Sequence, residues 1–216
     1  MSAKKIFVYG ASGHGKVVGD ILLARREANF VGFIDDNSEF WEKKILGFPV
    51  LGNGEWLQQE TKQTRVAVAL GVGDNFLRQK IAERCDVWGA EVVTLTHPSA
   101  SVSASARLGR GTVVMAHATI NPDAKIGLGV IINTSAIVEH DVDIGDFAHV
   151  APNAAMAGAS RLGTLSQLGI GAVVIQCVSI GACTIVGGGA VVVRDIPDQV
   201  LAMGVPALVH RTLKSL

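Results

Sequence analysis

The chain has 216 residues, of which 49% are hydrophobic and only 5% aromatic, and its 19 basic and 19 acidic residues give a formal net charge of zero. A balanced charge without a basic cluster argues against a nucleic-acid-binding surface. No stretch reaches the roughly 18 uninterrupted apolar residues that a membrane span needs, so we expect no membrane insertion.

The first predicted elements are a strand, a glycine loop, a helix and a second strand. The apolar run Ile6–Tyr9 leads into Gly10-Ala-Ser-Gly-His-Gly15, a helical pattern follows, and the run Phe30–Ile34 ends at Asp35 and Asp36. This order is typical of the mononucleotide-binding half of a doubly wound α/β fold. In such folds, backbone N–H groups of the loop receive phosphates, and the acidic residue accepts hydrogen bonds from the ribose or the base.

The glycine loop leaves several functions open. Its GxxGxG spacing differs from the GxGxxG fingerprint of dinucleotide-binding enzymes, although a nicotinamide enzyme stays possible. Residues 10–16 also fit the GxxxxGK pattern of P-loop NTPases, but Val17 follows where a P-loop needs Ser or Thr for magnesium. Glycines that merely turn a strand into a helix are a third reading. His14 is not a turn-forming residue, which favours a ligand contact.

Two further strands complete this region after a less regular stretch, residues 38–64. The buried run Arg65–Leu70 ends in glycines that open a helix, a pattern that again fits a nucleotide-binding crevice, and a fourth strand is expected over Glu91–Leu95. His97 and Pro98 then lead into a different pattern. We therefore expect a Rossmann-like α/β domain over residues 1–97 and a second domain with a C-terminal tail over residues 98–216.

A six-residue period dominates the chain from Val102 to Pro197. Four residues after the start of each hexad stands a small or β-branched residue, such as Ala106, Thr112 or Ala118. The hexads open with the aliphatic residues Val102, Leu108, Val114, Ile120, Ile126, Ile132, Val138, Ile144, Val150, Met156, Leu162, Leu168, Val174, Ile180, Val186 and Val192. Glycine directly follows the opening residue at Gly109, Gly127, Gly145, Gly163, Gly169, Gly181 and Gly187.

Such a period is the signature of a parallel β-helix. Each hexad predicts one short strand and one turn, with the opening residue and the small residue pointing inward. Three hexads close one triangular coil, so residues eighteen apart stack into a continuous aliphatic column. We expect the glycines after the opening residues to supply the positive φ angles of the corners.

The cysteines and the N-terminus indicate a compartment. Cys85, Cys177 and Cys183 are odd in number and form no CxxC pair, so we interpret them as buried thiols of a reducing compartment. The N-terminal apolar run is too short for a signal peptide. Both observations predict a cytoplasmic protein.

Histidines stand out among the polar residues of the hexads. His140 lies between Glu139 and Asp141, and a carboxylate beside an imidazole fixes its tautomer and raises its basicity, which makes His140 a candidate general base. Ordinary surface histidines are the alternative interpretation. His149 is nine residues further on, which is half a coil, so the two rings lie on opposite sides of one prism. A site that uses both must form between subunits, which favours a homotrimer.

Eight motifs span both expected domains: Tyr9-Gly-Ala-Ser-Gly-His-Gly15, Phe33-Ile-Asp-Asp-Asn37, Gly73-Asp-Asn75, His97-Pro-Ser-Ala100, Ile132-Asn-Thr-Ser135, Val138-Glu-His-Asp141, Gly145-Asp-Phe-Ala-His149 and Gly204-Val-Pro-Ala207. In combination they resemble the PglD-type nucleotide-sugar acetyltransferases, within the NeuD-like sialic acid O-acetyltransferase family of hexapeptide-repeat transferases. The resemblance implies that the β-helix is left-handed, an exception to the usual right-handed crossover.

The resemblance also implies an activity and its residues. The activity is transfer of acetyl from acetyl-CoA to the C4 amine of a UDP-linked amino-sugar, of the UDP-N,N'-diacetylbacillosamine type used in glycan biosynthesis, without an acyl-enzyme. His140 matches the general base, Asp141 stands where the family has a glutamate, and Asn133 matches a further active-site position. His149, Ile170 and Gly188 match the coenzyme A side. The residues matching the UDP-sugar site are Gly13, His14, Gly15, Asp35, Asp36 and Gly71.

Spacing adds one residue, and the alternatives remain. Gly158 follows His140 by eighteen residues, so it lies one coil above, where its N–H is a candidate oxyanion donor. O-acetylation of a sugar or sialic acid, and non-catalytic binding of a nucleotide sugar, are the competing functions. Hexapeptide-repeat carbonic anhydrases bind zinc through three histidines, two of them five residues apart. The histidines of the hexads here are 23 and 9 residues apart, so we expect no metal.

Overall fold

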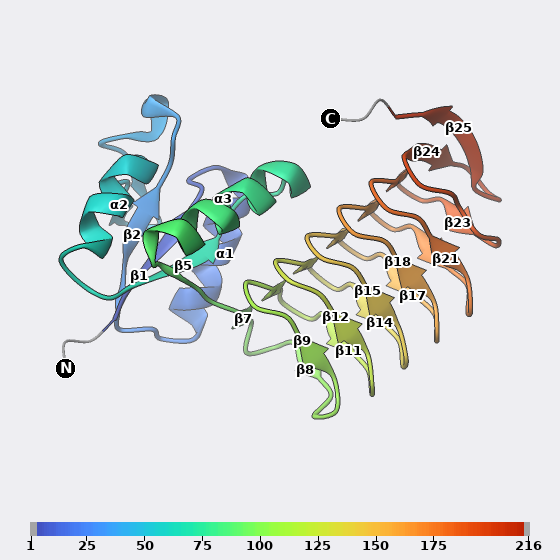
Figure 1. The fold of residues 1–216 in the computed structure, drawn as a ribbon. Coiled ribbons are helices and arrows are strands. Elements are labelled where there is room, and N and C mark those ends of the chain that lie inside the picture. The colour runs from blue at the N-terminus through green and yellow to red at the C-terminus, as the bar shows by residue number, and fades with distance from the viewer. Residues whose placement is uncertain (1–3, 214–216) are drawn as a thin grey trace. The chain divides into compact units, whose positions relative to one another are not determined.

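The computed structural model describes residues 4–213, so the outermost residues of both expected domains, 1–3 and 214–216, lie outside the described residues. The chain divides into two compact units, Met1–Pro98 and Ser99–Leu216. The first unit is α/β and the second is a parallel β-helix (Figure 1), which confirms the expected fold class. No helix of the described part is long and apolar enough to cross a membrane.

The first unit is built on a parallel sheet in the order β2-β1-β5-β6. The strands of this stretch of the chain are β1 (Lys5–Tyr9), β2 (Phe30–Ile34), β3 (Lys44–Ile45), β4 (Phe48–Pro49), β5 (Val66–Leu70), β6 (Glu91–Val92) and β7 (Leu95–Thr96), of which β3 and β4 pair only with each other. The helices are α1 (Gly13–Ala24), the short 3₁₀ helix η1 (Ser38–Phe40), α2 (Gly54–Thr61) and α3 (Asn75–Trp88). Helix α1 packs on β1 and β5, and α3 packs on β5 and β6. Strand β1 connects to β2 on one side, whereas β5 connects to β6 on the other, so the topology reverses between β1 and β5, where α/β folds bind ligands.

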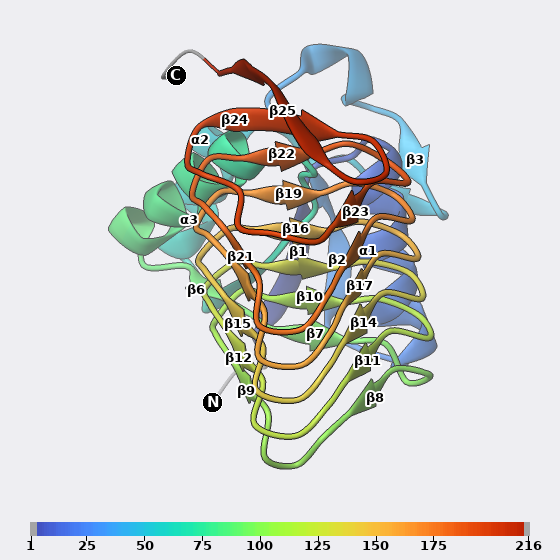
Figure 2. The same ribbon diagram turned by 90° about the vertical axis from the view of Figure 1, so that its right-hand side faces the viewer.

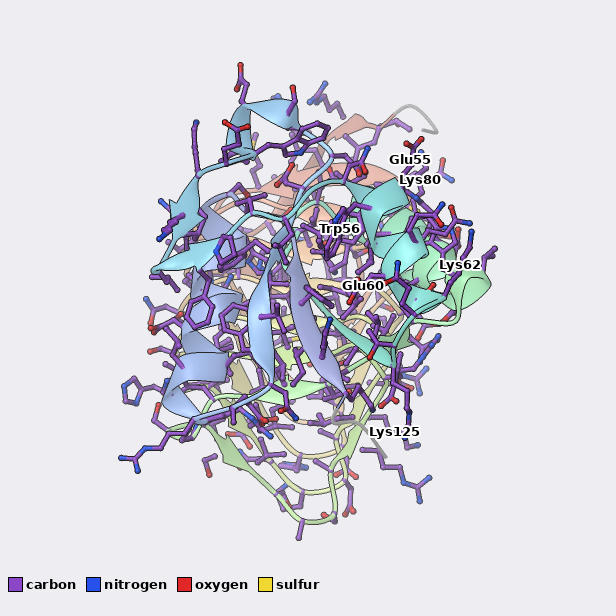
Figure 3. The ribbon with its side chains drawn as sticks, turned by 90° about the vertical axis from the view of Figure 1, so that its left-hand side faces the viewer. Glu55, Trp56, Glu60, Lys62, Lys80 and Lys125 are labelled. Carbon is purple, nitrogen blue, oxygen red and sulfur yellow. The ribbon has the colours of Figure 1, made fainter. Side chains whose placement is uncertain are left out.

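Two parts of this unit differ from the sequence-based expectation, the irregular stretch 38–64 and the fourth strand. The irregular stretch holds α2, whose start is fixed by Asn53, because its side chain accepts a hydrogen bond from the Trp56 N–H at 3.0 Å. Figure 3 shows Trp56 and Glu60 on this helix, where Trp56 meets the Phe7 ring edge-on at 5.7 Å between centroids and Glu60 accepts from the Lys5 ammonium at 2.6 Å. The fourth strand, expected over Glu91–Leu95, is interrupted: β6 and its pairing with β5 end at Val92, and β7 begins at Leu95.

The second unit repeats one two-residue strand per hexad, and each opening residue is the last residue of its strand. The strands are β8 (Ser101–Val102), β9 (Arg107–Leu108), β10 (Val113–Val114), β11 (Thr119–Ile120), β12 (Lys125–Ile126), β13 (Ile131–Ile132), β14 (Ile137–Val138), β15 (Asp143–Ile144), β16 (His149–Val150), β17 (Ala155–Met156), β18 (Arg161–Leu162), β19 (Gln167–Leu168), β20 (Val173–Val174), β21 (Ser179–Ile180), β22 (Ile185–Val186) and β23 (Val191–Val192). Strands three apart pair in parallel with the predicted offset of eighteen residues. The hairpin of β24 (Val200–Met203) and β25 (Leu208–Thr212) follows the last hexad.

Three ladders of strands form the three faces of the prism (Figure 2). We name them the β14 face (β8, β11, β14, β17, β20 and β23), the β15 face (β9, β12, β15, β18 and β21) and the β16 face (β10, β13, β16, β19 and β22). The opening residues and the small residues four positions later form one buried core that continues from coil to coil. The inward alternation predicted from the hexads is therefore confirmed.

The corners correct the role that we expected for the glycines. From Leu108 to Val186, the positive φ angle falls three residues after the opening residue, at Gly111, His117, Asp123, Gly129, Ser135, Asp141, Phe147, Asn153, Ala159, Leu165, Gly171, Cys177, Cys183 and Gly189. Glycines directly after the opening residue lie against the next coil instead. A Cβ on Gly109 would come within 2.3 Å of the Gly127 carbonyl oxygen, and one on Gly145 within 2.5 Å of the Thr164 nitrogen. These glycines allow neighbouring coils to approach closely rather than making the turn.

The cysteines differ partly from the prediction. None of the three forms a disulfide, but only Cys85 is buried, whereas Cys177 is exposed and Cys183 is partly exposed. The prediction of three buried thiols is wrong because Cys177 and Cys183 occupy the corner position with positive φ, where the side chain leaves the core. The cytoplasmic location stays a prediction.

Candidate active site

The loops that follow β1 and β5 pack backbone against backbone. The Gly71 N–H donates to the Tyr9 carbonyl at 2.8 Å. A Cβ on Gly10 would lie 2.4 Å from the Gly71 oxygen, and one on Gly15 would lie 1.9 Å from the Gly10 oxygen. Gly15 and Gly71, both expected at the nucleotide-sugar site, are therefore required by this close approach itself. Gly13 is exposed, with open space around its Cα.

Helix α1 begins at Gly13 with a terminus suited to an anion. Its N-cap residue, Ser12, makes no side-chain capping bond, and its first turn carries no acidic residue. The other two α-helices of the described chain are capped by Asn53 and Asp74, whose side chains accept from backbone N–H groups. Because unsatisfied N–H groups and the helix dipole attract anions, the start of α1 fits a phosphate better than the other two.

His14 is held in its neutral form beside this terminus. Burial lowers its pKa to about 4, and the positive charge of Arg78 adds to the effect. The ring also lies next to the loop after β5, since a Cβ on Gly73 would be 3.9 Å from the His14 Cβ and Cγ. At neutral pH this imidazole carries no charge, so it can form hydrogen bonds with a ligand but contributes no attraction between opposite charges.

The two acidic residues after β2 tie segments of the first unit together. Asp35 accepts from the Ala11 N–H at 2.7 Å and from the Asn37 N–H at 2.9 Å, which fixes the glycine loop to the end of β2. Asp36 accepts from the Tyr9 hydroxyl at 2.9 Å and from the Gly54 N–H at 2.9 Å. Both carboxylates therefore have structural partners as well as the position expected for a nucleotide contact.

The sequence did not identify the further partner of Asp36. Arg84 on α3 donates to this carboxylate at 2.8 Å, and its guanidinium lies 4.7 Å from the Trp88 ring centroid. Burial alone would raise the pKa of Asp36, but the bonds from Arg84, Gly54 and Tyr9 outweigh it, so the pKa falls below its ordinary value. Arg84 is 48 positions from Asp36, and no local pattern signals such a pair. Tyr9, the single tyrosine of the chain, directly precedes the glycine loop and was visible only as part of a motif.

His140 and Asp141 form a pair at the corner between the β14 face and the β15 face. The His140 Nδ1 lies 2.8 Å from the Asp141 Oδ2. This bond raises the pKa of His140 above its ordinary value, and the charges of Asp141 and Glu139 act in the same direction. With Nδ1–H directed at the carboxylate, Nε2 carries the lone pair that can accept a proton.

Gly158 lies directly above the His140 ring, as the eighteen-residue spacing predicted. A Cβ on Gly158 would come within 2.6 Å of both Cε1 and Nε2 of His140. Any side chain at this position would therefore push the ring away. The reactive nitrogen of His140 and the backbone of Gly158 share one small space, which suits a base acting beside a backbone donor.

Asn133 and His149 form a second cluster, on the β16 face. The Asn133 Nδ2 lies 3.0 Å from the His149 Nε2, and the Asn133 Oδ1 accepts from the Thr134 N–H at 2.8 Å. An amide nitrogen can only donate, so His149 Nε2 accepts here. The β16 face is opposite the corner that carries His140, so one prism places Asn133 with His149 and away from His140.

Ile170 and Gly188 form a third cluster, one coil apart at the corner after the β16 face. Ile170 is 61% exposed, and a Cβ on Gly188 would lie 3.0 Å from the Ile170 Cγ2. The structure therefore places an exposed apolar side chain beside bare backbone at the two positions that the resemblance assigns to the coenzyme A side. Among residues 4–213 there is no group of three or more His, Cys, Asp or Glu side chains that could hold a metal ion.

Comparison with known proteins identifies relatives of both units. Residues 5–85 match the family model of the PglD N-terminal domain. UDP-N-acetylbacillosamine N-acetyltransferase of Bacillus subtilis (strain 168) is 38% identical over 121 residues. That match covers 52% of this chain and 52% of the relative, so only about half of each chain is compared.

Several solved structures match nearly the whole chain, two of which are described next. Perosamine N-acetyltransferase of Caulobacter crescentus, as a histidine-to-asparagine variant in complex with CoA and GDP-perosamine, has 42% sequence identity and a TM-score of 0.91, covering 97% of this chain and 98% of that one. The acetyltransferase domain of PglB from Neisseria gonorrhoeae FA1090, in complex with acetyl coenzyme A, has 35% identity and a TM-score of 0.89, covering 96% of this chain and 100% of that one.

Proposed function

We propose that this chain transfers acetyl from acetyl-CoA to the amine of a nucleotide-linked amino-sugar. The chain belongs to the PglD-type sugar N-acetyltransferases of the hexapeptide-repeat family. The observation that carries the proposal is the His140–Asp141 pair facing the backbone of Gly158. An exposed imidazole with a raised pKa and a bare backbone beside its reactive nitrogen is suited to deprotonate an attacking amine.

The acceptor that we propose is the C4 amine of a UDP-linked sugar of the bacillosamine type, which enters glycan biosynthesis. The Bacillus relative supports this choice through its name, although only half of the chain is compared. A GDP-linked amino-sugar is the second candidate, favoured by the Caulobacter relative, which matches the chain almost end to end. The two candidates share the amine and the diphosphate and differ in the base.

In the proposed reaction the amine nitrogen bonds to the thioester carbonyl carbon while the carbon–sulfur bond breaks. His140 Nε2 takes the proton that the amine loses, and Asp141 stabilises the resulting imidazolium. The same proton then goes to the departing thiolate, so that one amide and one free thiol are formed. The Gly158 N–H would donate to the carbonyl oxygen as negative charge develops there. Because the amine attacks the thioester directly, the reaction needs no acylated residue, and neither Cys177 nor Cys183 takes part in it.

The nucleotide would bind in the first unit, with its diphosphate at the start of α1. The supporting observations are the uncapped terminus at Gly13, the neutral ring of His14 and the reversal of strand order between β1 and β5. Asp35 and Asp36 lie at the end of β2 and accept hydrogen bonds from the protein. We propose that their remaining lone pairs contact the base or the ribose.

The complete acetyl-transfer site would form in a homotrimer. One prism holds His140 at one corner and His149, Ile170 and Gly188 on the other side, so the coenzyme A arm needs the second group from a neighbouring copy. The outward residues of the strands of the β14 face are uncharged, and Ile137 and Val173 among them are 42% and 40% exposed; Glu139 follows β14 and directly precedes His140. Light scattering of the purified protein should give three times the chain mass. A monomeric protein with full activity would refute the shared site.

The decisive experiment measures free thiol release from acetyl-CoA with a panel of acceptors. The panel holds UDP-linked and GDP-linked 4-amino-sugars, the corresponding sugars with a hydroxyl at C4, and free sialic acid. We expect turnover with at least one amino-sugar and none with the hydroxyl acceptors. Turnover with hydroxyl acceptors alone would establish O-acetylation instead. Nucleotide-sugar binding without thiol release from any acceptor would make the chain a binding protein.

A further inference from the structure

Arg78, on α3, is a charged side chain that is completely buried. Its relative exposure is 0%, and it is among the largest fully buried side chains of the described chain. Burial lowers its pKa to about 9, an effect that the charge of Asp74 offsets in part. Burying a guanidinium destabilises a protein unless its hydrogen bonds are satisfied. The hydrogen-bond partners of Arg78 therefore indicate which segment it stabilises.

Three hydrogen bonds tie Arg78 to the loop between β5 and α3 and to the first residue of that helix. Its Nη1 donates to the carbonyl oxygens of Val72 at 3.2 Å and Gly73 at 3.1 Å. Its Nη2 donates to the Asn75 Oδ1 at 2.8 Å. One rigid, planar group therefore fixes successive carbonyls and the first residue of α3 in a single conformation.

This loop forms one side of the candidate nucleotide site. Gly71, at its start, packs against Gly10 of the glycine loop, and Gly73 lies beside His14. The charge of Arg78 also contributes to the low pKa of His14. A substitution of Arg78 would therefore change the position of the loop that packs against the glycine loop, and removal of its charge would change the pKa of His14.

We infer that Arg78 is a positioning residue for the nucleotide half of the reaction: by holding residues 72–75 it keeps the loop after β5 in place opposite the glycine loop and His14. The inference rests on the proposed function, because it assigns the nucleotide to this site. Arg78 does not touch the substrate in this account. The alternative is that Arg78 only stabilises the first unit.

The test compares Arg78→Met, Arg78→Lys and a matched control, Lys80→Met, which removes an exposed positive charge from the same helix (Figure 3). Steady-state kinetics give KM for the nucleotide amino-sugar and for acetyl-CoA separately, and calorimetry gives the affinity for UDP and GDP. Arg78→Met leaves two carbonyls without their donor, so we expect nucleotide-sugar KM to rise roughly 10- to 100-fold. KM for acetyl-CoA should change less than about twofold, because its expected contacts lie in the β-helix.

Two further results would be specific to positioning. Arg78→Lys, which retains the charge and some hydrogen bonds, should recover part of the nucleotide affinity, and Lys80→Met should behave as wild type. In Arg78→Met the pKa of His14, followed by NMR of the ring, should rise. This second readout needs no substrate. If the methionine variant does not fold, the nucleotide affinity of Arg78→Lys relative to wild type and Lys80→Met tests the inference, because lysine retains the charge but not the planar set of donors; an affinity equal to wild type would overturn the inference.

The possible failures are distinguishable. Unchanged nucleotide affinity in a folded Arg78→Met protein would overturn the inference and leave the proposed function standing. A variant that loses thermal stability but keeps both KM values would assign Arg78 to stability alone. Wild-type protein that binds neither UDP- nor GDP-linked sugars would overturn the proposed function, and the inference with it.

Discussion

Two histidines, one in each unit, occupy opposite environments. His14 is partly buried beside the cation of Arg78, and its pKa is lowered to about 4. His140 is largely exposed beside the anion of Asp141, and its pKa is raised. The same side chain is therefore kept neutral in one unit and made more basic in the other. Local charge and burial, rather than residue type, therefore determine whether a histidine ring is suited to hydrogen bonding or to accepting a proton.

The largest effect that the comparison predicts is loss of the base. His140→Asn should reduce kcat by about 10²- to 10⁴-fold, because proton transfer by a positioned side chain contributes that much. The assay is thiol release at saturating substrates.

His117→Asn is the matched control, since His117 is also exposed on the β-helix and asparagine tolerates its φ of 58°. It should keep the wild-type rate. A His140→Asn protein with near-normal turnover would contradict the assignment of the base.

The second prediction concerns His14 and stability. Its pKa of about 4 lies below the ordinary value of 6.5, so the unfolded chain binds more protons between these values. The free energy of unfolding is therefore greatest above pH 6.5 and falls as the pH drops towards 4. The shift corresponds to about 3 kcal/mol.

Urea unfolding of wild type and His14→Gln at pH 7.5 and pH 4.5 measures this contribution. The difference between the two proteins cancels the titration of all other groups. We expect His14→Gln to lose less stability on acidification than wild type. Equal losses in both proteins would mean that His14 is not held neutral.

A third prediction tests the space around His140. Gly158→Ala would place a methyl group within 2.6 Å of the ring, so the ring must move. A shift of about 1 Å at a catalytic group can cost 100-fold, and we expect kcat to fall roughly 10- to 100-fold. Thermal unfolding checks that the coils remain stacked. Unchanged kcat in a folded Gly158→Ala protein would remove Gly158 from the site.

The smallest expected effect is that of Asp141→Asn. Asparagine tolerates the positive φ of this corner, so the change removes only the charge. Without the carboxylate, the pKa of His140 should fall towards its ordinary value, and the acid limb of the pH–rate profile should move to lower pH. The rate at high pH should change less than about tenfold, because the pair is exposed and screened. An unmoved acid limb would mean that Asp141 does not control this histidine.

The sequence predicted the β-helix almost completely, because its period dictates it. Each aliphatic opening residue must face the core, and the eighteen-residue stack then places Gly158 over His140 without any further information. The role predicted for the glycines after the opening residues was wrong. A tight turn and the close approach of two coils both require a small residue, so the sequence alone does not distinguish these two roles.

The first unit was less predictable for a physical reason. Its strands and glycine loop were expected, but the bonds from Arg84 to Asp36 and from Arg78 to Val72 and Gly73 depend on how helix α3 packs. A buried arginine has the same sequence signature as an exposed one. Neutral His14 could not be foreseen, because its pKa depends on that same burial.

The central claim is that acetyl passes directly from acetyl-CoA to the amine of a nucleotide-linked sugar, with His140 as the base. The most direct measurement is mass and NMR analysis of the products of one reaction, run in parallel with wild type and His140→Asn. We expect wild type to form one N-acetyl group at the C4 amine for each thiol released, with no acetyl on the protein, and His140→Asn to form almost none. Acetyl found as an ester or on the protein, or equal product from both proteins, would contradict the account.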